Sequence, residues 1–177
     1  EYHNFSYYGA EDADNIIILM GSATEAARAA IDHLVAEGKK VGMVAVHLYR
    51  PFSIKHLFAA VPATVKKIAV LDRTKEPGAE GEPLYLDVKS AYYDQENRPV
   101  IVGGRYGLGS SDITPAKIIS VFNNLDLPEP KNHFTVGIVD DVTFTSLPAV
   151  EEMALGGKSI YEAKFFGLGA DGTVGAN

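Results

Sequence analysis

Cysteine is absent from this chain of 177 residues. Disulfide frameworks and iron–sulfur or zinc centres bound through cysteine thiolates are therefore excluded for the chain itself. Any redox centre that it serves must be held by residues outside it. The apolar runs at 16–20 and 41–46 are too short to cross a bilayer, and Glu1 does not begin a signal peptide, so we expect a cytoplasmic protein without a membrane partner.

An excess of positive charge is also lacking. Lysine and arginine number 16 against 23 aspartates and glutamates, and the formal net charge is -7. Proteins that bind nucleic acids usually carry a basic excess or a basic stripe, whereas Lys39-Lys40 and Lys66-Lys67 are only pairs. We therefore expect no nucleic-acid partner. The hydrophobic content of 46% is enough for the core of one globular domain.

Apolar runs alternate with helical patterns in the first half of the chain. The runs at 15–20, 41–46 and 67–71 predict strands buried on both faces, as in a parallel sheet. Apolar residues at helical spacing predict helices over 25–37 and from Ser53 to about Ala60. Three strands joined by two helical crossovers are typical of a parallel βαβαβ unit.

The second half extends the same pattern. The sequence predicts helices over 85–93 and 116–124, a strand over 100–102, and a final strand over 134–139 at the edge of the sheet. The predicted fold class is therefore α/β: a doubly wound, mostly parallel five-stranded sheet with helices on both faces.

Polar residues follow the second predicted strand directly. His47, Tyr49 and Arg50 stand where the carboxyl end of a parallel strand meets ligands or other domains. They predict either an anion contact or a domain interface. We favour the interface, because arginine and tyrosine are common interface anchors.

Glycines surround Arg105 after the fourth predicted strand. The stretch Gly103–Gly109 lies between that strand and a helix, and Arg105 is placed to supply positive charge to an anion or an interface there. The alternative is that the glycines only shape a sharp turn.

A second glycine-rich stretch lies near the end of the sequence. Gly167, Gly169 and Gly172 have the spacing G-x-G-x-x-G, in which glycines let backbone amides approach a pyrophosphate. Taken alone, this short motif favours a plain tight turn over a phosphate-binding loop. The remaining histidines and acidic residues show no metal-ligand spacing, so we predict neither a catalytic nor a metal site within the chain.

Four longer strings carry a resemblance to a known family: residues 40–53, 71–85, 103–110 and 134–141. Together they closely resemble the single-chain pyruvate:ferredoxin (flavodoxin) oxidoreductases. The stretch 164–177 looks like the start of that family's third domain. Phe166 and Ala170 depart from the pattern, where tryptophan and serine are familiar, and they leave the family branch open.

The resemblance implies a fragment of a larger enzyme. Residues 1–155 would be its second domain, with a fold like the transketolase C-terminal domain, and 156–177 a linker and the start of the next domain. That enzyme would convert pyruvate and coenzyme A to acetyl-CoA and CO₂ and pass electrons to ferredoxin or flavodoxin. It would use thiamine diphosphate, Mg²⁺ and iron–sulfur clusters, none of them held by this fragment.

The resemblance also implies partners. The fragment would be a scaffold, inactive alone, that packs against other domains of the same polypeptide within a homodimer. Gly167, Gly169, Gly172 and Asn177 would approach coenzyme A, because the third domain contacts that substrate.

Two other interpretations remain open at this point. The chain is alternatively a freestanding nucleotide- or coenzyme A-binding module that uses its glycine loops, or the C-terminal domain of an ordinary transketolase-like enzyme. A doubly wound fold alone does not discriminate among them, since such folds host many functions.

Overall fold

The computed structural model describes residues 2–140 and 142–152. Its elements, in chain order, are β1 (Phe5–Gly9), β2 (Asn15–Met20), α1 (Ala23–Ala36), β3 (Val41–Val46), α2 (Ile54–Ala60), β4 (Lys67–Asp72), α3 (Pro83–Ala91), β5 (Val100–Tyr106), the 3₁₀ turn η1 (Leu108–Ser110), α4 (Pro115–Asp126) and β6 (Phe134–Val136). None of the helices in this part of the chain is long and apolar enough to cross a membrane.

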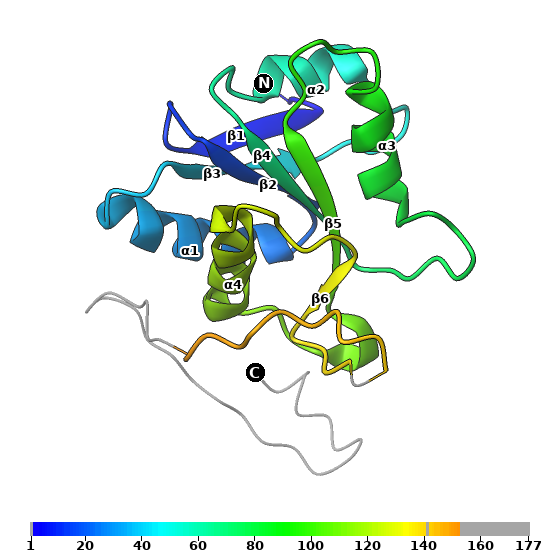
Figure 1. Ribbon diagram of the computed structural model, residues 1–177. Coiled ribbons are helices and arrows are strands. Elements are labelled where there is room, and N and C mark those ends of the chain that lie inside the picture. Colours follow the sequence, from blue (N-terminus) through cyan, green and yellow to red (C-terminus); the bar gives the residue numbers. More distant parts are fainter. Residues whose placement is uncertain (1, 141, 153–177) are drawn as a thin grey trace, which may run out of the picture.

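The strands form one sheet in the order β1-β3-β2-β4-β5-β6 (Figure 1). β2 to β6 run parallel to one another, whereas β1 runs antiparallel to its neighbour β3. The predicted α/β fold with a doubly wound, mostly parallel sheet is thus confirmed. The sequence predicted five strands, and β1 is a sixth that it did not reveal.

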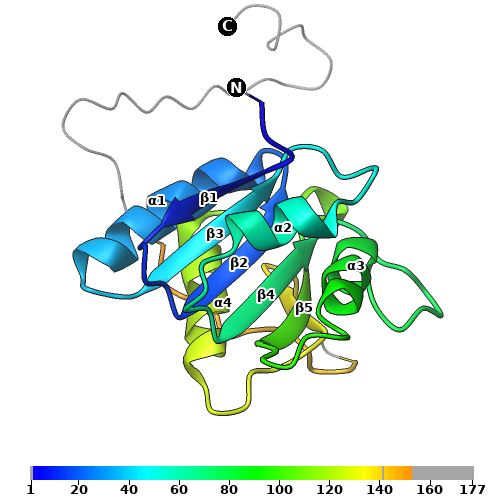
Figure 2. The same ribbon diagram turned by 90° about the horizontal axis from the view of Figure 1, so that it is seen from above.

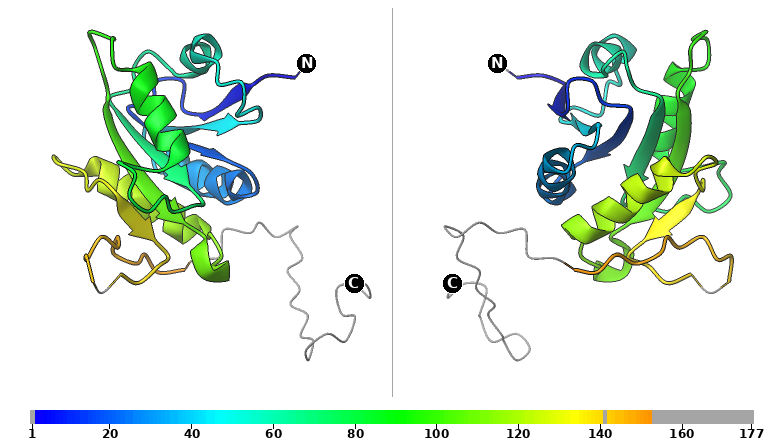
Figure 3. Two further views of the ribbon diagram at one scale, coloured as in Figure 1. Left: turned by 90° about the vertical axis from the view of Figure 1, so that its right-hand side faces the viewer. Right: turned by 60° about the vertical axis from the view of Figure 1, so that its left-hand side comes forward.

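Helices cover both faces of the sheet. α1 and α4 pack together on one face, and α2 and α3 lie on the other (Figures 2 and 3). Each face has its own core. Ile31 and Phe122 belong to the cluster beneath α1 and α4, and Leu57 and Val88 belong to the cluster beneath α2 and α3.

β2 shows why the strands are apolar along their whole length. Successive side chains of a strand point to opposite faces of the sheet. Ile17 and Leu19 accordingly enter the core under α1 and α4, and Ile16 and Ile18 enter the other core. All four side chains are 0% exposed. A strand buried on both sides therefore has no polar alternation, as the sequence indicated.

Local signals define the start of α4. The Thr114 hydroxyl oxygen accepts a hydrogen bond from the Lys117 amide at 3.4 Å. Pro115 lies in the first turn, where a backbone N–H would have no partner inside the helix, so the missing N–H of proline costs no helical hydrogen bond. The helix therefore begins just after β5 and η1 and returns across the face that α1 covers.

Candidate functional site

The carboxyl ends of β2 and β4 border an open cavity of about 420 Å³. The chain leaves β2 toward β3 on one side and later returns to β4 on the other, so this is the point where the winding direction of the sheet reverses. In open α/β sheets, ligands commonly bind at such a point. The cavity is lined by Met20, Gly21, Ser22, Tyr49, Leu71, Asp72, Arg73, Thr74, Pro83 and Tyr106.

Asp72, at the end of β4, is the acidic residue that lines this cavity, and 6% of its surface is exposed. Its two carboxylate oxygens accept hydrogen bonds from the backbone amides of Leu84 and Tyr85, each at 3.1 Å. These amides belong to the first turn of α3, which has no partners for them inside the helix. Burial raises the pKa of Asp72 even though the two amide bonds lower it. This carboxylate therefore anchors α3 to the sheet.

Tyr49 and Arg50 form a cluster with Asp87 of α3. The Tyr49 hydroxyl donates to Asp87 Oδ2 at 2.7 Å, and Arg50 Nη1 lies 2.7 Å from the same oxygen. Arg50 Nη2 also donates to the Tyr49 hydroxyl at 3.0 Å, and its guanidinium lies 3.9 Å from the ring centroid. The sequence predicted that Tyr49 and Arg50 contact an anion or another domain. The structure directs both toward Asp87, whose role the sequence did not signal because it lies 38 residues away from Tyr49.

The other two predicted contact residues lie apart from this cluster. His47 Nε2 is 2.7 Å from the Ser6 hydroxyl of β1. Arg105, near the end of β5, places Nε 3.7 Å from Glu82 Oε1, with 17% and 7% of the two side chains exposed. Among residues 2–140 and 142–152, the buried Arg105 Nε has no hydrogen-bond partner. An anion or interface contact by these residues stays a prediction.

The glycines around Arg105 have two separate roles. Gly103 and Gly104 lie inside β5, and a Cβ atom on either would overlap an aromatic ring, Tyr85 at the first and Phe134 at the second. Gly107 and Gly109 follow the strand with φ values of +67° and +63°, a conformation that glycine adopts without strain. This arrangement supports the interpretation as a packed strand followed by a sharp turn. Gly167, Gly169, Gly172 and Asn177 lie outside the residues that the structure describes.

The cluster of Tyr49 predicts a dependence of stability on alkaline pH. Burial and the hydrogen bond to Asp87 raise the Tyr49 pKa to about 12. Because the ordinary phenol titrates near pH 10, the stabilisation is complete below pH 10 and is lost as the pH rises through about 12. In a tyrosinate absorbance titration at 295 nm, we expect the difference between the wild type and Tyr49→Phe to have its midpoint near pH 12. A midpoint near pH 10 would show that the phenol is not held this way.

The ionisable groups at the carboxyl edge are thus bonded mainly to the domain's own helices and loops. Arg73 follows the same pattern, since its Nε donates to the Gly107 carbonyl at 3.2 Å. Across residues 2–140 and 142–152, no three histidine, cysteine, aspartate or glutamate side chains are grouped so as to hold a metal ion. Fold and site together define a doubly wound α/β domain whose charged groups at this edge mostly contact other parts of the same domain.

The comparisons with known proteins agree with this class. The model of pyruvate:ferredoxin oxidoreductase core domain II matches residues 13–118, and the chain belongs to this family. A pyruvate-flavodoxin oxidoreductase from Enterobacter agglomerans is 59% identical over 178 residues, which cover 100% of this chain and 15% of the relative. A pyruvate:ferredoxin oxidoreductase from Moorella thermoacetica is 52% identical, over 99% of this chain and 15% of that protein.

A solved structure shows the same fold. The 2-oxoglutarate:ferredoxin oxidoreductase from Magnetococcus marinus, with 2-oxoglutarate, coenzyme A and succinyl-CoA bound, matches with a TM-score of 0.53 and 26% identity. The match covers 69% of this chain and 19% of that one. The chain therefore spans about 15% of the length of the curated relatives quoted above, and corresponds to one portion of much larger oxidoreductases.

Proposed function

We propose that this chain is the second domain of an oxidoreductase that converts pyruvate and coenzyme A to acetyl-CoA and CO₂ and passes electrons to ferredoxin or flavodoxin. Within that enzyme its role is that of a scaffold, and alone it is inactive. The observation that carries the proposal is the internal use of the charged groups at the carboxyl edge: Asp72 anchors α3, and Arg50 pairs with Asp87. A site built for chemistry would direct such groups toward a reactant.

The cofactors of such an enzyme do not fit the residues present here. Iron–sulfur clusters need cysteine thiolates, and the chain has none. Thiamine diphosphate binds together with Mg²⁺, which takes oxygen ligands. Among the described residues, no three histidine, cysteine, aspartate or glutamate side chains are grouped so as to hold such an ion. We therefore place these cofactors in other parts of the longer protein.

The proposal includes the domain boundaries and partners. Residues 1–155 form the domain, and 156–177 link it to the next domain, where Gly167, Gly169, Gly172 and Asn177 approach coenzyme A. The longer protein is a cytoplasmic homodimer. The freestanding coenzyme A- or nucleotide-binding module is not favoured, because the relatives carry this sequence as 15% of a longer polypeptide.

The proposal is tested by comparing the 177-residue chain with the longer protein that contains it. We expect pyruvate- and coenzyme A-dependent reduction of a viologen dye by the longer protein and only the buffer rate by the chain. Calorimetry should detect coenzyme A binding to the chain no tighter than about 1 μM, because the other walls of the pocket are absent. Dye reduction by the chain above the buffer control would refute the scaffold role.

A further inference from the structure

The outer side of β1 has unpaired backbone groups. The Asn4 carbonyl accepts from the His47 amide, and the Ala10 amide donates to the Val41 carbonyl, so even-numbered residues turn their polar groups toward β3. In an antiparallel pair these residues alternate with others whose amides and carbonyls point away. Phe5, Tyr7 and Gly9 therefore present their backbone groups to the outside. Within residues 2–140 and 142–152 no strand pairs with that side.

This edge lacks the usual protection against pairing. Exposed edge strands commonly carry charged residues, proline or a bulge, which prevent another strand from adding to the sheet. β1 has the sequence Phe-Ser-Tyr-Tyr-Gly, with no charge and no proline, and its register with β3 is continuous over all five residues. Three of its five residues are aromatic, and aromatic residues favour strands.

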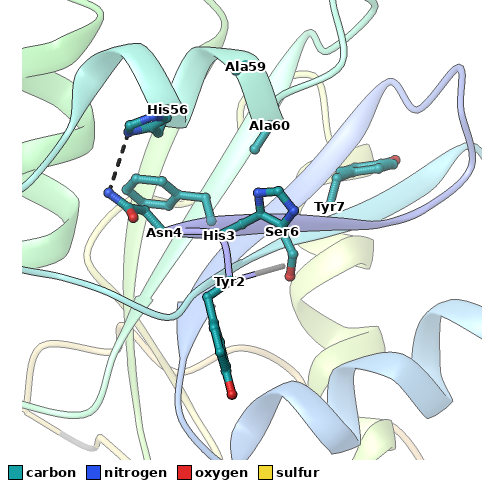
Figure 4. A pocket seen from close by; sticks show the side chains of 9 residues that line it. Tyr2, His3, Asn4, Ser6, Tyr7, His56, Ala59 and Ala60 are labelled. Atoms are coloured by element: carbon teal, nitrogen blue, oxygen red, sulfur yellow. Dashed lines mark hydrogen bonds between the residues drawn. The ribbon is translucent and has the colours of Figure 1, made fainter.

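A groove lies beside this edge. A cavity of about 390 Å³ opens between the first residues of the chain and α2, and Figure 4 shows the side chains around it. Ala59 and Ala60 of α2 and the ring of Tyr7 give it apolar surface, and His3 and His56 lie beside them. Recognition by strand addition uses this combination: an open edge supplies main-chain hydrogen bonds, and an adjacent pocket accepts a side chain.

We propose that an extended segment of the same long polypeptide, outside residues 1–177, adds to the sheet beside β1 and places an apolar side chain in this groove. The inference rests on the proposed function, since it needs the longer protein. The relatives are several times the length of this chain, so most of such a polypeptide is available to supply the strand. A segment of the same molecule also reaches the edge at a high effective concentration, unlike a second copy.

Amide hydrogen exchange tests this inference. In the isolated chain, the outward amides of Tyr7 and Gly9 should exchange at least about 100-fold faster than the inward amides of Ser6 and Tyr8, and in the longer protein the two sets should be similarly slow. Fast outward exchange in the longer protein would overturn the inference. So would protection already present in the isolated chain, whether monomeric or dimeric, because the edge would then be closed without the added segment.

A matched pair of variants gives a second measurement. Tyr7→Ala and Tyr7→Pro both remove the ring, but only proline removes the outward N–H. Proline is tolerated where a strand's N–H faces solvent, so the two variants of the isolated chain should have melting temperatures within about 3 °C. In the longer protein Tyr7→Pro should lose the protection at Gly9 and Tyr7→Ala should keep it. Equal protection at Gly9 in the two variants would contradict the added strand.

The two proposals fail in different ways. Pyruvate-dependent dye reduction by the same preparation of the longer protein reports on the proposed function, whatever the exchange data show. An active protein with a freely exchanging edge overturns only the added strand.

Discussion

Asp72→Ala is expected to lower the free energy of unfolding by about 3 kcal/mol. The substitution removes a buried carboxylate that accepts hydrogen bonds from the amides of Leu84 and Tyr85. Those amides begin α3 and would be left unsatisfied in a region where Leu84 and Tyr85 are 0% exposed. Urea unfolding followed by circular dichroism measures the effect, since the chain has no tryptophan to report on it.

Two further variants make the Asp72 experiment specific. Asp72→Asn keeps one acceptor oxygen but turns an amide donor toward the other backbone N–H, so we expect a loss of about 2 kcal/mol. Asp94→Asn changes an exposed aspartate in the loop after α3 and should alter stability by less than about 0.5 kcal/mol. If Asp72→Ala were as mild as this control, Asp72 would not be the anchor of α3.

The second large effect is expected for Gly104→Ala. Gly104 of β5 lies opposite Phe134 of β6, whose ring is 0% exposed and lies over the glycine. A Cβ atom there would overlap the ring, so either the ring or β6 must move. We expect a loss of about 3 kcal/mol, at the upper end of the usual cost of overpacking a core. Thermal unfolding of the variant measures this loss.

The cause of the Gly104 effect can be isolated with a double-mutant cycle. Phe134→Leu alone should cost about 1 to 2 kcal/mol, because it leaves space in the core. If the ring is what the new methyl group strikes, the double variant should be more stable than the sum of the single effects by about 1 kcal/mol or more. Strict additivity would place the cause of the Gly104 effect elsewhere.

Strands buried on both faces were the features most readily predicted from the sequence. The runs at 15–20 and 41–46 correspond to β2 and β3 with unchanged bounds, because full burial selects a continuous apolar string. β1 escaped prediction because it is a short aromatic strand with only one neighbour in the described chain. Its partner β3 is distant in sequence, with Gly42 opposite Gly9 and Val46 opposite Phe5, and no local pattern encodes such a pairing.

For three of the predicted contact residues, the sequence indicated the position in the fold but not the contacts within the domain. His47, Tyr49 and Arg50 were expected at a carboxyl end, and the structure places them there, because the residues after a strand of a parallel sheet emerge at that edge. Their partners come from β1 and α3, at separations that only the tertiary fold sets. Asp72 was not among the predicted site residues, since a carboxylate that caps a distant helix has no signature in its own neighbourhood.

The two cores of the domain have a consequence for how the protein can vary. Ile16 and Ile17 are adjacent in sequence, yet each belongs to a cluster on a different side of the sheet. Substitutions on opposite sides share few contacts, and their effects on stability should be nearly independent, whereas substitutions within one cluster should depend on each other. During divergence, substitutions in the core on one side of the sheet need not be matched by substitutions in the other core. Among related sequences, residues of one core that are distant along the chain should therefore covary more often than residues that are adjacent in a strand.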